Sequence, residues 1–260
     1  MSPSPSSAAT PASKSRPIAI VAGVAVAAAL LGVVSYTATK PSGDRSADSA
    51  SSAAEVSADP TNGVYPELEA YARRDAADGL ALGRPDAPVV LIEYADFKCG
   101  YCAQFARETE PALVRKYVEK GTLRIEWRNF PIFGEESEAA ARAAWAAGQQ
   151  GRFWEFHRAA YAQGAKEKGF GKDRLAALAR EAGVADPARF ARDTDGAAAR
   201  EAVSKDQEQG YSLGATSTPS FLVNGRPIAG AQPEEAFTEA IDAAAKAAAA
   251  KPSATATPGR

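Results

Sequence analysis

Side chains that bind metal ions are scarce in this sequence. It contains a single histidine, His157, a single methionine at its first position and only two cysteines. Because metal sites need several such ligands, a multi-histidine centre is excluded and a copper-handling function is disfavoured. The formal net charge of −2 also gives the chain no strongly basic field, so we expect no nucleic-acid partner.

The shortage of cysteine also limits how disulfides can be used. Both cysteines lie in one short motif, Cys99-Gly100-Tyr101-Cys102, so no third cysteine is available for a structural disulfide. A static bridge between them would close too small a loop to add much stability. A static disulfide and one half of a metal site are the alternatives to a redox pair, and the lack of further ligands weighs against the metal site. Stability must therefore come from packing.

The position of the motif predicts a reactive thiol. An apolar run, Val89–Ile92, precedes it, and helical spacing begins at about Ala103, so the motif lies where a strand passes into a helix. The free N–H groups and the positive end of a helix favour a thiolate at Cys99, and the thiolate is the nucleophile of thiol–disulfide exchange. We therefore predict that Cys99 is the attacking, partly exposed thiol and that Cys102 is the less exposed resolving thiol.

The N-terminal part of the chain has the pattern of an exported protein. Residues 1–16 are rich in Ser, Pro and Ala and are predicted to be a disordered cytoplasmic stub. Residues 17–39 carry no charge and follow Lys14 and Arg16, which predicts a single transmembrane anchor with a cytoplasmic N-terminus. A cleaved signal peptide is the alternative, although Tyr36 fits its cleavage site poorly. Either interpretation places the remaining chain outside the cytoplasm, where disulfides form and persist.

Three further regions follow the apolar segment. Residues 40–63 are dominated by Ser, Ala, Asp and Gly and are predicted to be a flexible linker. Residues 64–250 are predicted to be one folded domain, with an all-helical insertion at about 135–212. Residues 251–260 are predicted to be a disordered tail.

The folded region is predicted to have the order β-α-β, a block of helices, then β-β-α. Alternation of apolar and charged residues over Leu123–Phe130 predicts a strand with one buried face and one solvated face. Asn224-Gly225 predicts a two-residue hairpin turn. One continuous helix is predicted over 103–120, and helix N-caps are predicted at Ser137, Asp173 and Asp186.

This order, with its cysteine pair at the first strand-to-helix junction, resembles the thioredoxin fold, and the helical insertion resembles the DsbA-like branch of that superfamily. The segments that carry the resemblance are Val89–Cys102, Asn129–Pro131, Phe153–His157 and Ser217–Gly225. The resemblance implies an α/β, thioredoxin-like fold with an all-helical insertion, and the activity of a thiol–disulfide oxidoreductase.

The resemblance also implies roles for residues near the cysteine pair. A cis Thr218–Pro219 bond would face the cysteines and expose the backbone of Thr218 to an extended substrate chain. An ordinary proline that opens a strand is the alternative. Gly100 and Tyr101, between the cysteines, are expected to contact substrate.

Glu93 is the remaining candidate for a role in the chemistry. It lies in the strand that leads to the motif, and it is either an outward, solvated side chain or a buried proton carrier. In the thioredoxin superfamily an acid at this spacing exchanges the proton of the resolving thiol. Burial raises the pKa of a carboxyl and suits it to that work near neutral pH.

The direction of electron flow is less closely specified. Gly-Tyr between the cysteines and Thr218 before the proline are similar to disulfide isomerases, whereas a helical insertion without an added dimerisation domain is similar to oxidases. We expect a monomeric, membrane-anchored oxidant that donates disulfides to exported, cysteine-containing polypeptides. A reductase or isomerase and a non-catalytic peptide-binding chaperone are the alternatives. The resemblance implies re-oxidation by a membrane quinone-linked partner, and the cysteine pair would act without a cofactor or metal.

Overall fold

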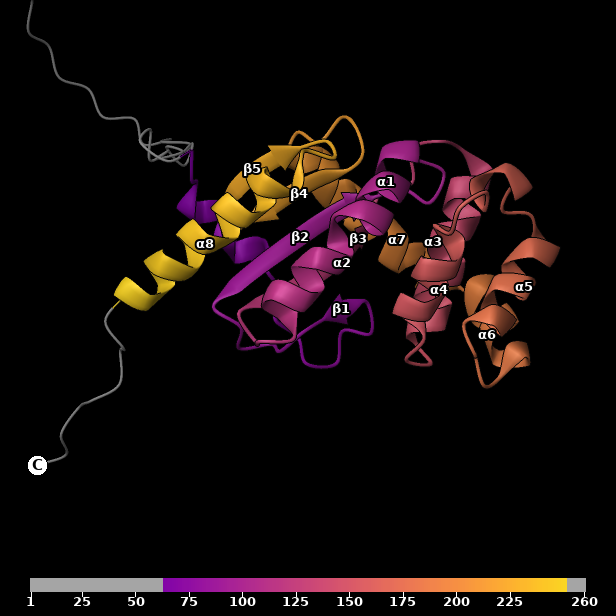
Figure 1. Cartoon of the computed structure of the whole chain (residues 1–260). Coiled ribbons are helices and arrows are strands. Elements are labelled where there is room, and N and C mark those ends of the chain that lie inside the picture. The colour runs from indigo at the N-terminus through magenta and orange to yellow at the C-terminus, as the bar shows by residue number, and fades with distance from the viewer. Residues whose placement is uncertain (1–62, 252–260) are drawn as a thin grey trace, which may run out of the picture. The chain divides into compact units, whose positions relative to one another are not determined.

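The computed structural model describes residues 63–251 (Figure 1). The segments predicted as cytoplasmic stub and transmembrane anchor, 1–16 and 17–39, lie outside the described residues, as do 40–62 and 252–260. Within the described part of the chain, every helix is too short or too polar to cross a membrane.

A five-stranded mixed sheet forms the centre of the domain, in the order β1-β3-β2-β4-β5. Its strands are β1 (Ala81–Leu82), β2 (Val89–Ala95), β3 (Leu123–Asn129), β4 (Ser220–Val223) and β5 (Arg226–Ala229). β2 and β3 are parallel, and every other neighbouring pair is antiparallel. The apolar run of the sequence becomes the central strand, and all seven residues of β2 are buried because elements cover both faces of the sheet.

Alternate residues of β2 face two different cores. Leu91 and Ala95 belong to the larger core, which also contains both cysteines, whereas Val90 and Ile92 belong to a smaller core on the opposite face. Glu93 is in phase with Leu91 and Ala95, because side chains alternate along a strand. The strand therefore directs Glu93 to the same face of the sheet as the cysteines.

The single helix predicted over 103–120 is wrong, because three elements occupy that region. α1 (Gly100–Glu108) begins earlier than predicted, with Cys99 as its N-cap. α2 (Glu110–Leu113) and the π-helical η2 (Val114–Val118) follow it. Pro111 accounts for the break, since proline lacks a backbone N–H and its ring clashes with the preceding turn of a helix. The apolar periodicity continues across the break and does not reveal it.

Helices fill the chain between β3 and β4. They are α3 (Glu135–Gly148), α4 (Phe153–Ala160), η3 (Lys166–Lys168), α5 (Lys172–Glu181), α6 (Pro187–Thr194) and α7 (Ala197–Ser212). Figure 1 shows α3 to α6 grouped beside one end of the sheet, whereas α8 (Glu234–Ala250) packs on β2 and β4 and α7 packs on β3. A short helix, η1 (Pro66–Tyr71), precedes the sheet. The predicted order of elements is confirmed.

Two of the three predicted helix caps are wrong. Gly134 and Gly171 are the N-cap residues of α3 and α5, and the predicted caps Ser137 and Asp173 lie inside the first turns. Polar residues such as Ser and Asp suit the N-cap and also the first turn of a helix, so composition alone does not tell these two positions apart. Asp186 does cap α6, because its side chain accepts a hydrogen bond from a backbone N–H of the first turn at 2.8 Å.

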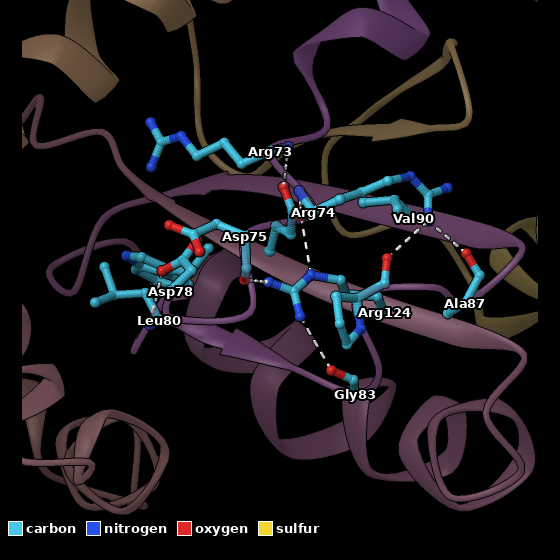
Figure 2. A network of polar contacts seen from close by, with 12 residues as sticks. Arg73, Arg74, Asp75, Asp78, Leu80, Gly83, Ala87, Val90 and Arg124 are labelled. Atoms are coloured by element: carbon cyan, nitrogen blue, oxygen red, sulfur yellow. Dashed lines mark hydrogen bonds and ion pairs between the residues drawn. The ribbon is translucent and has the colours of Figure 1, made fainter.

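The charged face of β3 is buried, which contradicts the predicted solvent exposure. Arg124, Glu126 and Arg128, which we call the ionic layer, are 3%, 0% and 0% exposed. Glu126 accepts hydrogen bonds from Arg124 Nε at 2.9 Å and from Arg128 Nη2 at 2.7 Å. Figure 2 shows Arg124 beneath the segment that follows η1, where Arg73 and Arg74 each donate a backbone N–H to Glu126. That segment covers β3, so the face of the strand that was expected to be solvated is internal.

Candidate active site

Cys99 lies at the strand-to-helix junction, where the sequence predicts it. Its Sγ accepts a hydrogen bond from the backbone N–H of Cys102 at 3.4 Å, as the N-cap of α1. Hydrogen bonding from the Cys102 side chain, with further donors around the thiol, outweighs burial and lowers the pKa of Cys99 to about 6. Cys99 is 4% exposed and so more buried than predicted. At neutral pH this thiol is mostly ionised.

Cys102 has the opposite character. It is 0% exposed in the larger core, and burial raises its pKa well above the usual value, with the Cys99 side chain and the charge of Glu93 acting in the same direction. Cys102 therefore holds its proton when Cys99 has lost its own. This asymmetry separates a nucleophile from a resolving thiol.

The Thr218–Pro219 peptide bond is cis, as predicted, and it faces the cysteines. Cys99 Sγ lies 3.3 Å from the carbonyl oxygen of Thr218. The loop that carries this bond leads directly into β4, which pairs with β2 and so fixes the loop beside the start of α1. The sheet thereby joins two segments that are far apart in the sequence.

A cleft of about 950 Å³ opens beside Cys99. Gly100, Tyr101 and Thr218 line it, together with Lys98, Gln104, Ile132, Phe133, Lys166, Thr216 and Ser217. Tyr101 is 68% exposed and Phe133 is 51% exposed, which leaves two aromatic rings in contact with solvent at the cleft. Exposed aromatic surface in a cleft is typical of a binding site. No sequence pattern singled out Phe133 or Lys166.

Glu93 is buried, which excludes an outward, solvated side chain, and its role as a proton carrier stays a prediction. It is 0% exposed, and neither of its carboxylate oxygens has a hydrogen-bond partner among the described residues. Burial raises its pKa well above the usual value, and the charges of Glu110 and Cys99 raise it further. Burial therefore favours the protonated form of this carboxyl, on the face of the sheet that also carries the cysteines.

Glu110 and His157 are two further buried polar residues of the domain. Burial raises the pKa of Glu110 to about 8 and lowers the pKa of His157 to about 3. Oε2 of Glu110 lies 3.7 Å from Nε2 of His157, but both side chains are uncharged at neutral pH and do not form an ion pair. Sequence analysis missed Glu110, because a glutamate just before a proline has the pattern of an exposed first-turn residue.

No group of three or more His, Cys, Asp or Glu side chains that could hold a metal ion occurs within residues 63–251. The fold and the two thiols instead define a class of protein, the thioredoxin-like protein-disulfide oxidoreductases. The chain belongs to the thioredoxin family, whose family model, described as thioredoxin, matches residues 75–243.

Known proteins of this class resemble the chain over most of the described region. The Probable disulfide bond formation protein D of Bacillus cereus is 32% identical over 164 residues, which are 61% of this chain and 74% of that protein. BdbD of Bacillus subtilis, in its oxidised form, has a TM-score of 0.60 at 24% identity and covers 66% of this chain and 95% of its own. α-DsbA1 of Wolbachia pipientis has a TM-score of 0.57 at 23% identity and covers 65% and 92%. The chain therefore has the DsbA-like fold and is a protein-disulfide oxidoreductase.

Proposed function

We propose that this oxidoreductase acts outside the cytoplasm and donates the Cys99–Cys102 disulfide to exported polypeptides. The observation that carries the proposal is the low pKa of Cys99, about 6, beside the raised pKa of Cys102. A stable Cys99 thiolate stabilises the reduced form of the pair. Stabilising the reduced form makes the disulfide a stronger oxidant.

The reaction proceeds through a mixed disulfide at Cys99. A client thiolate attacks Cys99 Sγ, the Cys99–Cys102 bond breaks, and its electron pair moves to Cys102 Sγ. Glu93 then gives its proton to Cys102, which is too deeply buried to remain a thiolate. A second client thiolate attacks the client sulfur of the mixed disulfide and releases Cys99 as a thiolate. The client loses two electrons and the protein disulfide gains them.

The cleft supplies a binding surface for an extended client chain. The Thr218 backbone borders Cys99, so a client strand that pairs with this segment presents its cysteine to Cys99 Sγ. Gly100 leaves the approach to the motif open, and the exposed rings of Tyr101 and Phe133 offer apolar contact to unfolded chains. This surface favours polypeptides over small thiols as clients.

Location and partners form a further part of the proposal. The apolar segment 17–39 supports export and anchoring at the cell membrane, with the N-terminus in the cytoplasm and secretion if the segment is cleaved. A donor must be re-oxidised after each cycle, and we propose a membrane quinone-linked partner that an anchored enzyme meets at high effective concentration. The enzyme would work as a monomer and without a cofactor, because the cysteine pair itself carries the electrons.

The reduction potential of the Cys99–Cys102 pair tests the direction of the reaction. We would titrate the full-length chain in detergent against glutathione and quantify the two forms by alkylation. A potential between about −120 and −180 mV is expected for a disulfide donor. A potential at or below about −230 mV would assign the protein to the reductases and overturn the proposed direction.

A further inference from the structure

Asp96 is a buried residue whose side chain bonds to separate parts of the chain around the cleft, and the proposed function assigns it no role. It is 2% exposed. Its Oδ1 accepts hydrogen bonds from the backbone N–H of Lys98 at 2.7 Å and from the Ser137 hydroxyl at 2.8 Å. Its Oδ2 accepts from the backbone N–H groups of Ile132 at 2.7 Å and Phe133 at 3.2 Å. One carboxylate therefore joins the cysteine motif to the chain that follows β3.

The backbone of Asp96 fixes its place beside the nucleophile. Its carbonyl oxygen accepts hydrogen bonds from the backbone N–H of Cys99 at 3.0 Å and from the hydroxyl of Tyr161, just after α4, at 2.9 Å. The Tyr161 ring is buried and stacks on Phe97 at a centroid distance of 5.1 Å. Asp96 thus has a fixed position relative to Cys99, and a group that is bonded to its carboxylate takes a fixed position as well.

Ile132 and Phe133, which we call the cleft edge, depend on Asp96 for their position. They belong to residues 130–134, which form neither helix nor strand, and both line the cleft. Among residues 63–251, Asp96 Oδ2 is the only acceptor for their backbone N–H groups. Gln207 of α7 donates to the carbonyl oxygen of Pro131 at 2.6 Å, which anchors the start of this segment but not the cleft edge. The link between the cleft edge and Cys99 therefore runs through Asp96.

A carboxylate suits this place better than a neutral side chain of similar size. Four donors converge on Asp96, whereas an asparagine has one acceptor oxygen and a serine has a single hydroxyl. Hydrogen bonds to a carboxylate are also shorter and stronger than those between neutral groups. Burying a charge costs free energy unless the charge is well bonded, so an apolar side chain would fill the same space at a lower cost. Asp96 thus contributes through its bonds and not through packing.

We propose that Asp96 is a positioning residue for client polypeptides, because it holds the cleft edge at a fixed place relative to Cys99. The exposed ring of Phe133 then meets apolar residues of a client while the client cysteine lies at Cys99 Sγ. Asp96 acts through the cleft edge and does not line the cleft itself. The inference rests on the binding of client polypeptides in the cleft, as proposed above.

Hydrogen exchange of the unaltered full-length protein in detergent gives the first test. The backbone N–H groups of Ile132 and Phe133 should exchange at least about tenfold more slowly than that of Gly134, because hydrogen-bonded amides are protected from exchange. Gly134 is the control, since it follows the cleft edge directly and its N–H has no acceptor among the described residues. Exchange at all three positions at the same rate would overturn the anchoring role of Asp96.

The second test compares Asp96→Ala with Ser137→Ala, which removes one bond to the same carboxylate. The measured quantity is the ratio of kcat/KM for a synthetic dithiol peptide rich in Phe and Leu to the rate of exchange with glutathione. Asp96→Ala should lower this ratio at least about threefold, mainly through a higher KM for the peptide. Ser137→Ala should keep the ratio of the parent protein, because Ser137 belongs to α3 and does not line the cleft. Equal ratios in the two variants would contradict the proposal.

Asp96→Asn keeps the proposal testable even if Asp96→Ala folds poorly. The single oxygen of an asparagine can still accept from Ile132 and Phe133, while its NH₂ group donates to the Ser137 hydroxyl. Only the N–H of Lys98 then loses its acceptor. This variant should recover most of the peptide-to-glutathione ratio and the slow exchange at the cleft edge. Slow exchange together with a ratio as low as that of Asp96→Ala would show that the cleft edge does not position the client.

Phe133→Ser separates this inference from the function on which it rests. If Asp96 acts through the cleft edge, Asp96→Ala added to Phe133→Ser should lower the ratio no further than Phe133→Ser alone. Additive losses would refute the role of Asp96 and leave the client surface intact. If Phe133→Ser alone keeps the ratio of the parent protein, the proposed client surface itself fails, and the inference fails with it.

Discussion

At the scale of single residues, the two cysteines of the site differ in how readily they ionise. Cys99 and Cys102 belong to one turn of helix, yet the pKa of the first is lowered and that of the second is raised. The difference comes from position, because the N-cap collects hydrogen-bond donors and the next turn faces the core. Sequence spacing predicts the same contrast, because a helix N-terminus presents free N–H groups and a positive dipole end to the first thiol.

Cys102→Ala tests this contrast directly. The Cys102 side chain is the largest influence that lowers the pKa of Cys99, so its removal should raise that pKa from about 6 toward 9, its ordinary value. The rise should be incomplete, because the backbone donors of the helix remain. The pH dependence of Cys99 alkylation by iodoacetamide measures the shift. An unchanged alkylation profile would mean that the helix alone stabilises the thiolate.

At the scale of elements, sequence patterns predicted which segments form strands and helices better than they predicted which faces are buried. The Asn224-Gly225 hairpin formed as expected, since both residues have positive φ angles. The alternation in β3 was correctly interpreted as a strand, but the segment after η1 covers its charged face. Such a cover comes from a distant part of the chain, so local periodicity carries no information about it. Glu110 was missed because a glutamate just before a proline has the pattern of an exposed first-turn residue.

The ionic layer should be worth far more to the fold than an exposed ion pair. Glu126→Gln leaves Arg124 and Arg128 buried with fewer partners, so we expect a loss of about 3–5 kcal/mol in the free energy of unfolding. Glu138→Gln, which affects the 3.8 Å pair between the exposed Glu138 and the half-buried Arg142, should cost about 0.5 kcal/mol or less. Denaturant unfolding of both variants measures the difference. Equal losses in the free energy of unfolding would contradict the larger contribution expected of the ionic layer.

Glu126→Gln should also change how the stability of the protein depends on pH in the acidic range. Hydrogen bonds and nearby arginines outweigh burial and hold the pKa of Glu126 below its usual value of 4.5. The stabilisation is therefore fully present above about pH 4.5 and disappears as the pH falls through the folded-state pKa. Glu126→Gln should flatten this acidic part of the stability profile.

At the scale of the whole molecule, the cleft combines separate parts of the chain. The start of α1, the segment after β3, the region of η3 and the loop before β4 each contribute residues to it. Phe133 belongs to this surface although it is far from Cys99 and Cys102 in the sequence. Its side chain is 51% exposed. The cleft could not be predicted from the sequence, because its members share no motif and meet only in the folded domain.

Phe133→Ser should separate client binding from the chemistry of the thiols. We expect kcat/KM for a reduced, unfolded polypeptide to fall about threefold or more, because apolar contact area is lost at the cleft. Exchange with glutathione, which is too small to span the cleft, should keep its rate. Parallel stopped-flow measurements with the two substrates provide the comparison. Equal losses for both would show that Phe133 affects the thiols instead.

The contact between Cys99 and Thr218 joins residues 119 positions apart in the chain. Cys99 leaves the ribosome long before Thr218, and β4 can pair with β2 only after the helices between β3 and β4 have been synthesised. An unfinished chain therefore holds a cysteine pair without the backbone that presents a client to it. The two halves of the site therefore meet only when β4 pairs with β2, late in the synthesis of the domain.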